Sequence, residues 1–281
     1  MTPDFDAAFD GLFGLAFPSI SSPGFEPPLF TLAKQGLLNA NQFSFTLGED
    51  GGRLDLGRAP GQHLNTPTWI KVVRPQFWAI SVDWVAVDTR SVDPSKLTRV
   101  LNASPQLRRY PLARTASSRM LELTANGIGL LDSGTTTVLC PTAMAAQINR
   151  LIGASDNGLH VDCSASTTGP TLYFSVSDGR GSPGYVVAIA PHQYILGDGD
   201  SAHGCMSAFQ PGSPNNKWIL GLPFFANHTI TFDIDSGRIG FSQARSDPAG
   251  YEASLSSTAD PELDTAQSPP AKPSVRNIFD T

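Results

Sequence analysis

The sequence predicts a mostly β fold, and three observations point to it. Gly and Pro supply abundant turns, with 26 and 23 copies among 281 residues. Only 16% of the residues are charged and 40% are hydrophobic, enough for a sizeable core in one or two domains. Segments in which apolar and polar residues alternate are short and separated by turn residues. We therefore expect β-sheets accompanied by a few short helices.

Charge and apolar runs argue against several classes of function. The formal net charge is -6, and the basic residues are scattered, so we expect no nucleic-acid surface. No apolar run is long enough to span a membrane. Residues 1–20 lack the basic start of a signal peptide. The His and Cys residues show no metal-ligand spacing, and no Gly-rich phosphate loop precedes a helix, so we expect no metal and no cofactor.

The first part of the chain predicts a short helix and then strands. Apolar residues within 28–35 predict the helix, and Gly36 follows as its C′ residue. Alternation predicts strands at 43–47, 53–56, 69–73 and 77–87. Residues 88–123 are polar and irregular with scattered basic side chains, so we expect a solvated loop there.

The second part predicts one longer helix among further strands. Pro141 starts a helix whose apolar residues share one face, and Gly153 ends it. Strands are predicted at 159–161, 171–176, 185–189, 218–221, 230–234 and 238–241. The last two strands should form a hairpin. From Arg245 onward Ser, Pro, Ala and Asp dominate, which predicts a disordered tail over 245–281.

The most informative segment is an acidic turn. Three apolar residues of an expected buried strand lead into Asp132, and a second apolar strand follows the turn. A carboxylate there lies in a setting of low polarity, which raises the cost of ionising it. Gly134 allows the backbone to approach the carboxylate, and the hydroxyls of Ser133 and Thr135 can bond its oxygens. A rigidly held carboxylate of this kind suits general acid/base chemistry.

The segment Leu131-Asp132-Ser133-Gly134-Thr135-Thr136 resembles the active-site loop in the C-terminal lobe of the pepsin-like aspartic peptidases, family A1. Companion motifs resemble that family in the same order: 10–16, 43–47, 76–80, 191–196 and 218–221. The D-[ST]-G triplet alone is a weak signal, because Asp235-Ser236-Gly237 repeats it in what we interpret as a hairpin turn. The resemblance implies a pepsin-like acid protease fold, present here as one near-complete β-rich lobe with short helices.

The resemblance also implies roles for single residues. Asp132 would be catalytic. Its active-site loop would consist of Ser133, Gly134 and Thr135. In that loop Ser133 would brace the two lobes and Thr135 would hold the outer carboxylate oxygen. Thr136 would meet the backbone of a peptide or protein substrate. Phe77 would edge the primed substrate pockets, although a core role is the simpler interpretation of an aromatic residue on a strand.

A disulfide and a cellular location follow from the same resemblance. Cys163 and Cys205 resemble the paired cysteines of the C-terminal lobe, which leaves Cys140 free. The family is secreted or vacuolar, and a disulfide suits an oxidising compartment. Two N-glycosylation acceptor triplets, at 102–104 and 227–229, matter only on that route. The closeness of Asn227 to an apolar strand argues against its use.

Half of the family's active site is not found in the sequence. Members carry a first aspartate in a D-T-G-S loop well before the segment that begins here at Asp10, and a flap hairpin with a tyrosine besides. We therefore interpret 1–65 as a remnant of the N-terminal lobe with interlobe strands, 66–244 as the C-terminal lobe, and 245–281 as the tail. The expected function is that of an aspartic-type endopeptidase, with this chain inactive by itself because a dyad needs two carboxylates.

Three interpretations of the missing half remain open. The chain is an incomplete product of a peptidase gene that needs its missing N-terminal lobe. It is a single-lobe protein that pairs with a second chain to rebuild a dyad, as retroviral peptidases do. Or it is a non-catalytic protein that binds peptides or proteins.

Overall fold

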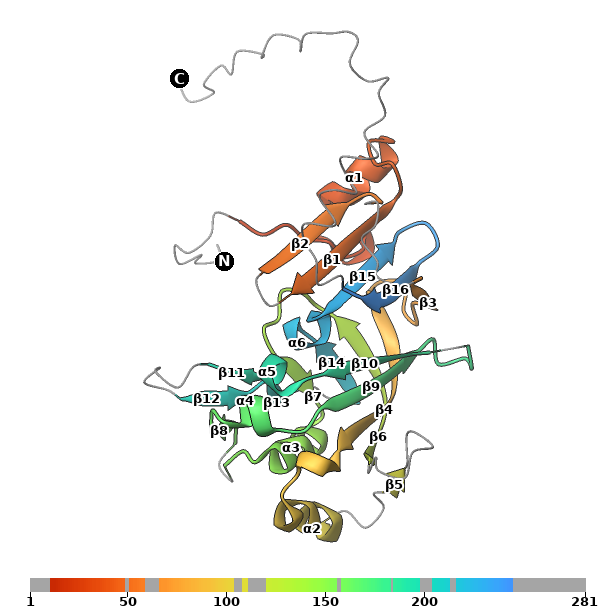
Figure 1. Cartoon of the computed structure of the whole chain (residues 1–281). Coiled ribbons are helices and arrows are strands. Elements are labelled where there is room, and N and C mark those ends of the chain that lie inside the picture. The colour runs from red at the N-terminus through yellow and green to blue at the C-terminus, as the bar shows by residue number, and fades with distance from the viewer. Residues whose placement is uncertain are drawn as a thin grey trace. The chain divides into compact units, whose positions relative to one another are not determined.

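The computed structural model describes residues 11–48, 51–58, 66–103, 108–110, 120–155, 158–182, 184–197, 204–212 and 216–244. All of these residues belong to one compact unit. They form three β-sheets with short helices between the strands, as Figure 1 shows, so the predicted mostly β fold is confirmed. The tail predicted over 245–281 lies outside the described residues.

A five-stranded antiparallel sheet joins the two ends of the described chain. Its strands, in spatial order, are β2 (Gly51–Leu56), β1 (Gln42–Gly48), β15 (His228–Asp233), β16 (Arg238–Gln243) and β3 (Thr68–Lys71). The predicted hairpin is confirmed as β15 and β16, with Ile230 opposite Phe241. Because β1 and β2 pair with strands from the other end of the sequence, this one sheet contains residues from both sides of the predicted boundary at 65/66.

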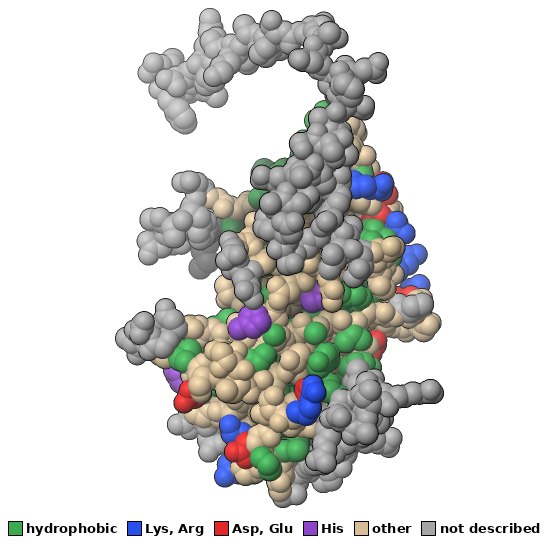
Figure 2. Space-filling model, in the orientation of Figure 1, with side chains coloured by type: hydrophobic (Ala, Val, Ile, Leu, Met, Phe, Trp, Pro, Cys, Tyr) green, Lys and Arg blue, Asp and Glu red, His purple; other side chains and the backbone are tan. Residues whose placement is uncertain are grey.

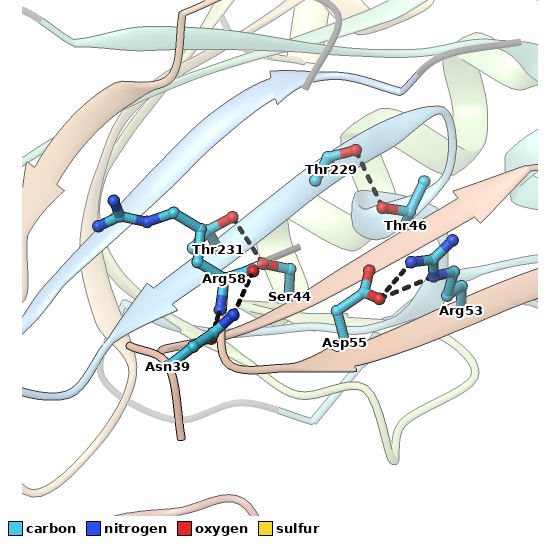
Figure 3. Close-up of polar contacts among 8 residues, drawn as sticks. All are labelled: Asn39, Ser44, Thr46, Arg53, Asp55, Arg58, Thr229 and Thr231. Carbon is cyan, nitrogen blue, oxygen red and sulfur yellow. Dashed lines mark hydrogen bonds and ion pairs between the residues drawn. The ribbon is translucent and has the colours of Figure 1, made fainter. Parts of the chain in front are cut away.

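The five-stranded sheet has an apolar face and a polar face, as alternating strands require. On the apolar face Phe43 and Phe232 stack with ring centroids 4.6 Å apart, and Trp78 packs edge-on against Phe232 at 5.1 Å. On the polar face two hydroxyl pairs cross from β1 to β15, drawn in Figure 3. Ser44 and Thr231 lie 2.8 Å apart, and the hydroxyls of the second pair, on Thr46 and Thr229, lie 3.0 Å apart.

An eight-stranded mixed sheet carries the acidic turn. In spatial order it comprises β10 (Tyr185–Ile189), β9 (Leu172–Ser177), β4 (Ala79–Asp88), β6 (Met120–Leu131), β14 (Lys217–Leu220), β7 (Val138–Cys140) and β13 (Phe209–Pro211), while β5 (Arg108–Tyr110) pairs with β6. The strands that the alternation predicted are confirmed within two residues at each end. The strand leading to Asp132 is longer than the predicted apolar lead, since β6 spans 12 residues.

The third sheet is small and is held by a disulfide. It pairs β11 (Ile195–Leu196), β12 (Cys205–Ser207) and β8 (His160–Val161). The predicted bond between Cys163 and Cys205 is present, with the two Cα atoms 5.1 Å apart. It fastens the segment just after β8 to the first residue of β12.

Short helices cover the sheets. They are η1 (Pro18–Ile20), α1 (Pro28–Lys34), η2 (Thr89–Ser91), α2 (Pro94–Ala103), α3 (Thr142–Ile152), α4 (Ala165–Thr168), α5 (Pro191–Tyr194) and α6 (Leu222–Phe225). The predicted helices are confirmed as α1 and α3. Gly36 has φ +67° and Gly153 has φ +91°, the left-handed backbone that ends a helix without a Cβ clash.

The prediction of a solvated loop at 88–123 is wrong. This stretch contains η2, α2, β5 and the first part of β6. The start of α2 carries a recognisable signal, because Asp93 Oδ1 accepts the Ser95 N–H at 2.7 Å and Pro94 is the first helical residue. The helix buries Val100, of which 1% is exposed. The prediction failed because the scattered basic residues of this stretch were interpreted as the sign of a solvated loop.

Basic and acidic side chains are interspersed on the surface. On the described part of the face drawn in Figure 2, Lys and Arg lie near Asp and Glu, and no patch of a single sign forms. Ion pairs among the described residues include Arg90 with Asp88 and Arg238 with Asp233. Such pairing is typical of a solvated surface.

Candidate active site

The acidic turn connects two strands that are not adjacent in the sheet. The chain leaves β6 at Leu131, turns through residues 132–137 and returns as β7. Strand β14 lies between these two, parallel to β6 and antiparallel to β7. The turn therefore passes over the end of β14. The turn thus packs against a strand, Lys217–Leu220, that comes much later in the sequence.

Both oxygens of the Asp132 carboxylate accept hydrogen bonds from the turn itself. The Gly134 N–H donates to Oδ1 at 3.0 Å, and the Thr135 hydroxyl donates to Oδ2 at 2.6 Å. The Thr135 N–H also donates to the Asp132 carbonyl oxygen at 3.2 Å. These bonds fix the orientation of the carboxylate, and Asp132 keeps intermediate exposure at the same time. A group that is oriented and still accessible is suited to proton transfer.

Backbone hydrogen bonds connect the turn to the end of β14 and to the residues that follow it. The Asp132 N–H donates to the Leu220 carbonyl at 3.1 Å, and the Leu222 N–H donates to the Thr135 carbonyl at 2.9 Å. Between them lies Gly221, where a Cβ would clash with the carbonyl oxygens of Thr135 and Thr137. Only glycine permits this approach, which is why the expected Trp-Ile-Leu-Gly motif packs tightly against the turn.

The segment just before β4, which contains Phe77, runs beside the turn. The Leu131 N–H donates to the Trp78 carbonyl at 2.9 Å, so the residue before Asp132 is bonded to the residue after Phe77. Trp78 is 5% exposed, and its indole N–H donates to the Leu15 carbonyl at 2.9 Å. Phe77 itself has intermediate exposure, so it is only partly a core residue.

Two other predicted site residues lie on the turn with accessible side chains. Ser133 has intermediate exposure and Thr136 is exposed. Leu222 was not predicted as a site residue, yet it is 37% exposed and bonded through its backbone to Thr135. The sequence signal for it is its place directly after Trp218-Ile219-Leu220-Gly221.

The second D-S-G triplet forms a hairpin turn, as predicted. It connects β15 to β16, and Gly237 there has φ +56°. The Asn41 amide donates to both carboxylate oxygens of Asp235, at 3.0 Å and 3.2 Å. The triplet therefore serves the turn and the link to Asn41. Its two flanking strands, β15 and β16, pair directly with each other, whereas β14 lies between the strands that flank Asp132.

The remaining reactive groups do not form a second site in the described part of the chain. Burial raises the pKa of the Cys140 thiol to about 12, so this free cysteine is a poor nucleophile. No group of three or more His, Cys, Asp or Glu among the described residues is placed to hold a metal ion. None of the helices in these residues is long and apolar enough to cross a membrane.

Comparison with known proteins finds relatives that match most of the chain. A family model described as "Eukaryotic aspartyl protease" matches residues 2–244. Pepsin A of Sus scrofa is 28% identical over 245 residues, which cover 83% of this chain and 54% of that protein. Pepsin-2B of Gadus morhua is 26% identical, with 85% and 64% covered. A probable vacuolar protease A of Trichophyton verrucosum (strain HKI 0517) is 27% identical, with 84% and 53% covered. The chain thus spans between 53% and 64% of the length of these relatives.

Proposed function

Because the chain belongs to the eukaryotic aspartyl protease family, we propose that Asp132 is one of the two catalytic carboxylates of an aspartic endopeptidase. The observation that carries this proposal is the geometry of the turn. Both Asp132 oxygens are bonded, the carboxylate stays accessible, and β14 supports the turn from below. The second D-S-G triplet lacks this support.

The proposed chemistry needs a second carboxylate. Two facing carboxylates share one proton and hold a water molecule between them. One accepts a proton from the water as it attacks the peptide carbonyl, and the other donates a proton to the carbonyl oxygen. In this scheme Thr135 keeps the outer oxygen of Asp132 in place, and Ser133 braces the turn against the facing loop.

We propose that this second carboxylate is supplied from outside the 281 residues. The sequence has one further D-[ST]-G triplet, at Asp235, and the hairpin it forms does not fit the role. The chain by itself is then inactive. Either a facing lobe or a second chain completes the dyad.

Exposed apolar side chains support the need for a covering partner. Leu12 is 79% exposed, Phe25 is 75% exposed and Leu37 is 64% exposed, all in the N-terminal segment. Leu222, beside the acidic turn, is also uncovered. Exposed apolar side chains that gather into a contiguous patch are typical of surfaces that another protein element covers.

The substrate class and the location follow from the same proposal. A peptide or protein chain would lie over the turn, with its backbone near Thr136 and a side chain near Phe77. The Cys163–Cys205 disulfide suits an oxidising compartment, so we propose a secreted or vacuolar location.

An assay on the purified chain tests the proposal. We expect no cleavage of a denatured protein between about pH 3 and 6, where carboxyl groups titrate. Cleavage that disappears in Asp132→Asn, with a dimer mass in solution, would instead favour a homodimer that rebuilds the dyad. Binding of a denatured protein without cleavage, in every assembled form, would favour the non-catalytic interpretation.

A further inference from the structure

A turn between α6 and β15 presents Asn227 to solvent while fixing its backbone. The Asn227 N–H donates to the Leu47 carbonyl at 2.8 Å, and the Ala244 N–H donates to the Asn227 carbonyl at 3.0 Å. The residue has φ +59°, a left-handed conformation that Asn adopts more readily than most residues. Asn227 is nevertheless exposed, so the strand that argued against its use does not bury it.

The sequence after this turn completes an acceptor triplet, Asn227-His228-Thr229. We infer that Asn227 carries an N-linked glycan. An Asn-x-Ser/Thr triplet with a residue other than Pro in the middle is the acceptor for this modification. In the reaction the side-chain nitrogen of Asn227 forms a bond to the first sugar carbon of a lipid-pyrophosphate-linked oligosaccharide. The bond from that carbon to the phosphate oxygen breaks, the lipid pyrophosphate leaves, and the amide nitrogen loses one proton.

In the folded structure Asn227 is accessible, but the Thr229 hydroxyl that the transferase must recognise is buried. The third residue of the triplet, Thr229, is 0% exposed, and its hydroxyl lies 3.0 Å from the Thr46 hydroxyl (Figure 3). His228 is 5% exposed. A transferase that reads the Thr229 hydroxyl needs it free, so the glycan must be added before β15 pairs with β1. After folding, Asn227 stays exposed, so the surface can accommodate the glycan.

The second acceptor triplet provides a comparison within the same chain. Asn102 belongs to α2, and its side chain lies outside what the structure describes. For Asn227, in contrast, the structure describes the exposure of the residue, its turn backbone and the buried Thr229 hydroxyl.

This inference rests on the proposed secreted or vacuolar location. The test directs the chain into the secretory pathway with an added leader, so its result on glycosylation is independent of whether the chain is a peptidase. The 281-residue chain is expressed behind a secretory leader in eukaryotic cells. The secreted product is treated with a glycan-removing amidase in heavy-oxygen water, and peptides are read by mass spectrometry. We expect heavy oxygen at position 227. Recovery of folded, secreted chain with the Asn227 peptide unmodified would overturn the inference, whatever the chain's proteolytic activity.

Three variants separate the site from folding effects. Asn227→Gly removes the acceptor and tolerates φ +59°, so it should fold and lose one glycan by mass. Thr229→Ser keeps the hydroxyl and should keep the glycan. Asn102→Gln should leave the modification at Asn227 unchanged. Loss of one glycan in Asn102→Gln, with none lost in Asn227→Gly, would assign the modification to the other triplet and refute the inference.

The timing has its own test. Chain made without glycosylation is offered to the transferase and its lipid-linked donor, once folded and once reduced and denatured. We expect modification at Asn227 in the denatured chain only. Equal modification of the folded chain would contradict the requirement that Thr229 be free.

Discussion

Gly221 allows the acidic turn to pack closely against the end of β14 because it has no side chain. Its Cα lies against the carbonyl oxygens of Thr135 and Thr137, and a methyl group there would clash with both. We expect Gly221→Ala to lower the free energy of unfolding by about 1 to 3 kcal/mol, the usual cost of overpacking. Denaturant unfolding followed by fluorescence measures this change.

Gly14 is the matched control for this substitution. A Cβ at Gly14 meets nothing within 4 Å, and the residue has no positive φ. Gly14→Ala should therefore change stability by a few tenths of a kcal/mol at most. Equal effects of the two substitutions would show that Gly221 does not support the turn.

His228 makes the fold sensitive to moderate acid. Its Nδ1–H donates to the Ala226 carbonyl at 2.8 Å, and its ring packs edge-on against Tyr185. Burial lowers the pKa of His228 below its usual value. The unfolded chain therefore binds a proton more readily than the folded one as pH falls below about 6.5, and stability is lost over that range.

Comparing thermal unfolding at pH 7 and pH 5 tests this contribution. In His228→Gln the fall in Tm between the two pH values should be smaller than in the unchanged chain. His160 is exposed, so His160→Gln should leave the fall unchanged. An identical pH dependence in all three proteins would show that His228 is protonated equally well in the folded state.

At the scale of elements, the disulfide is the strongest local constraint. Cys163 and Cys205 are 42 positions apart and tie β12 to the segment after β8. In the chain-entropy model a loop of this length stabilises the fold by about 4 kcal/mol. We expect reduction to lower Tm markedly. Thiol titration of the unfolded chain should find one free thiol before reduction and three after it, and three before reduction would contradict the bond.

Sequence patterns predicted the elements whose periodicity is local. Strands β1 and β2, the hairpin β15–β16 and helix α3 follow from alternation or from an apolar stripe, and each was found. Helix α2 was missed because its basic residues were interpreted as part of a solvated loop, although Leu97 and Val100 lie one turn apart and Asp93-Pro94 marks its start. Short elements such as α6 were missed because contacts with distant strands, rather than their own sequence, hold them in place.

The same distinction applies to the site. The bonds within the turn, from Gly134 and Thr135 to Asp132, follow from residues next to each other and were anticipated. The bond from Asp132 to Leu220 joins residues 88 apart, and no sequence spacing contains it. In the sequence, only the resemblance to a known family singled out the Trp218 motif as a companion of the acidic turn.

For the molecule as a whole, the described core lies within residues 15–241. Residues 247–281 lie outside the described part of the chain, and their composition predicts no contribution to stability. Deleting 247–281 should leave Tm unchanged, as measured by differential scanning calorimetry. A clear drop in Tm would show that the tail contributes to the fold.

The central claim is that Asp132, and not Asp235, is half of a peptidase dyad. The most direct test places a lobe with a D-T-G-S loop in front of residue 1, taken from the protein's own transcript where it encodes one or else from a relative. Cleavage of a denatured protein is then measured for this fusion, for Asp132→Asn and for Asp235→Asn. We expect an active fusion, a loss on the order of 10³-fold or more in Asp132→Asn, and near-full activity in Asp235→Asn. An active fusion whose Asp132→Asn variant cleaves as fast as Asp235→Asn would contradict the account.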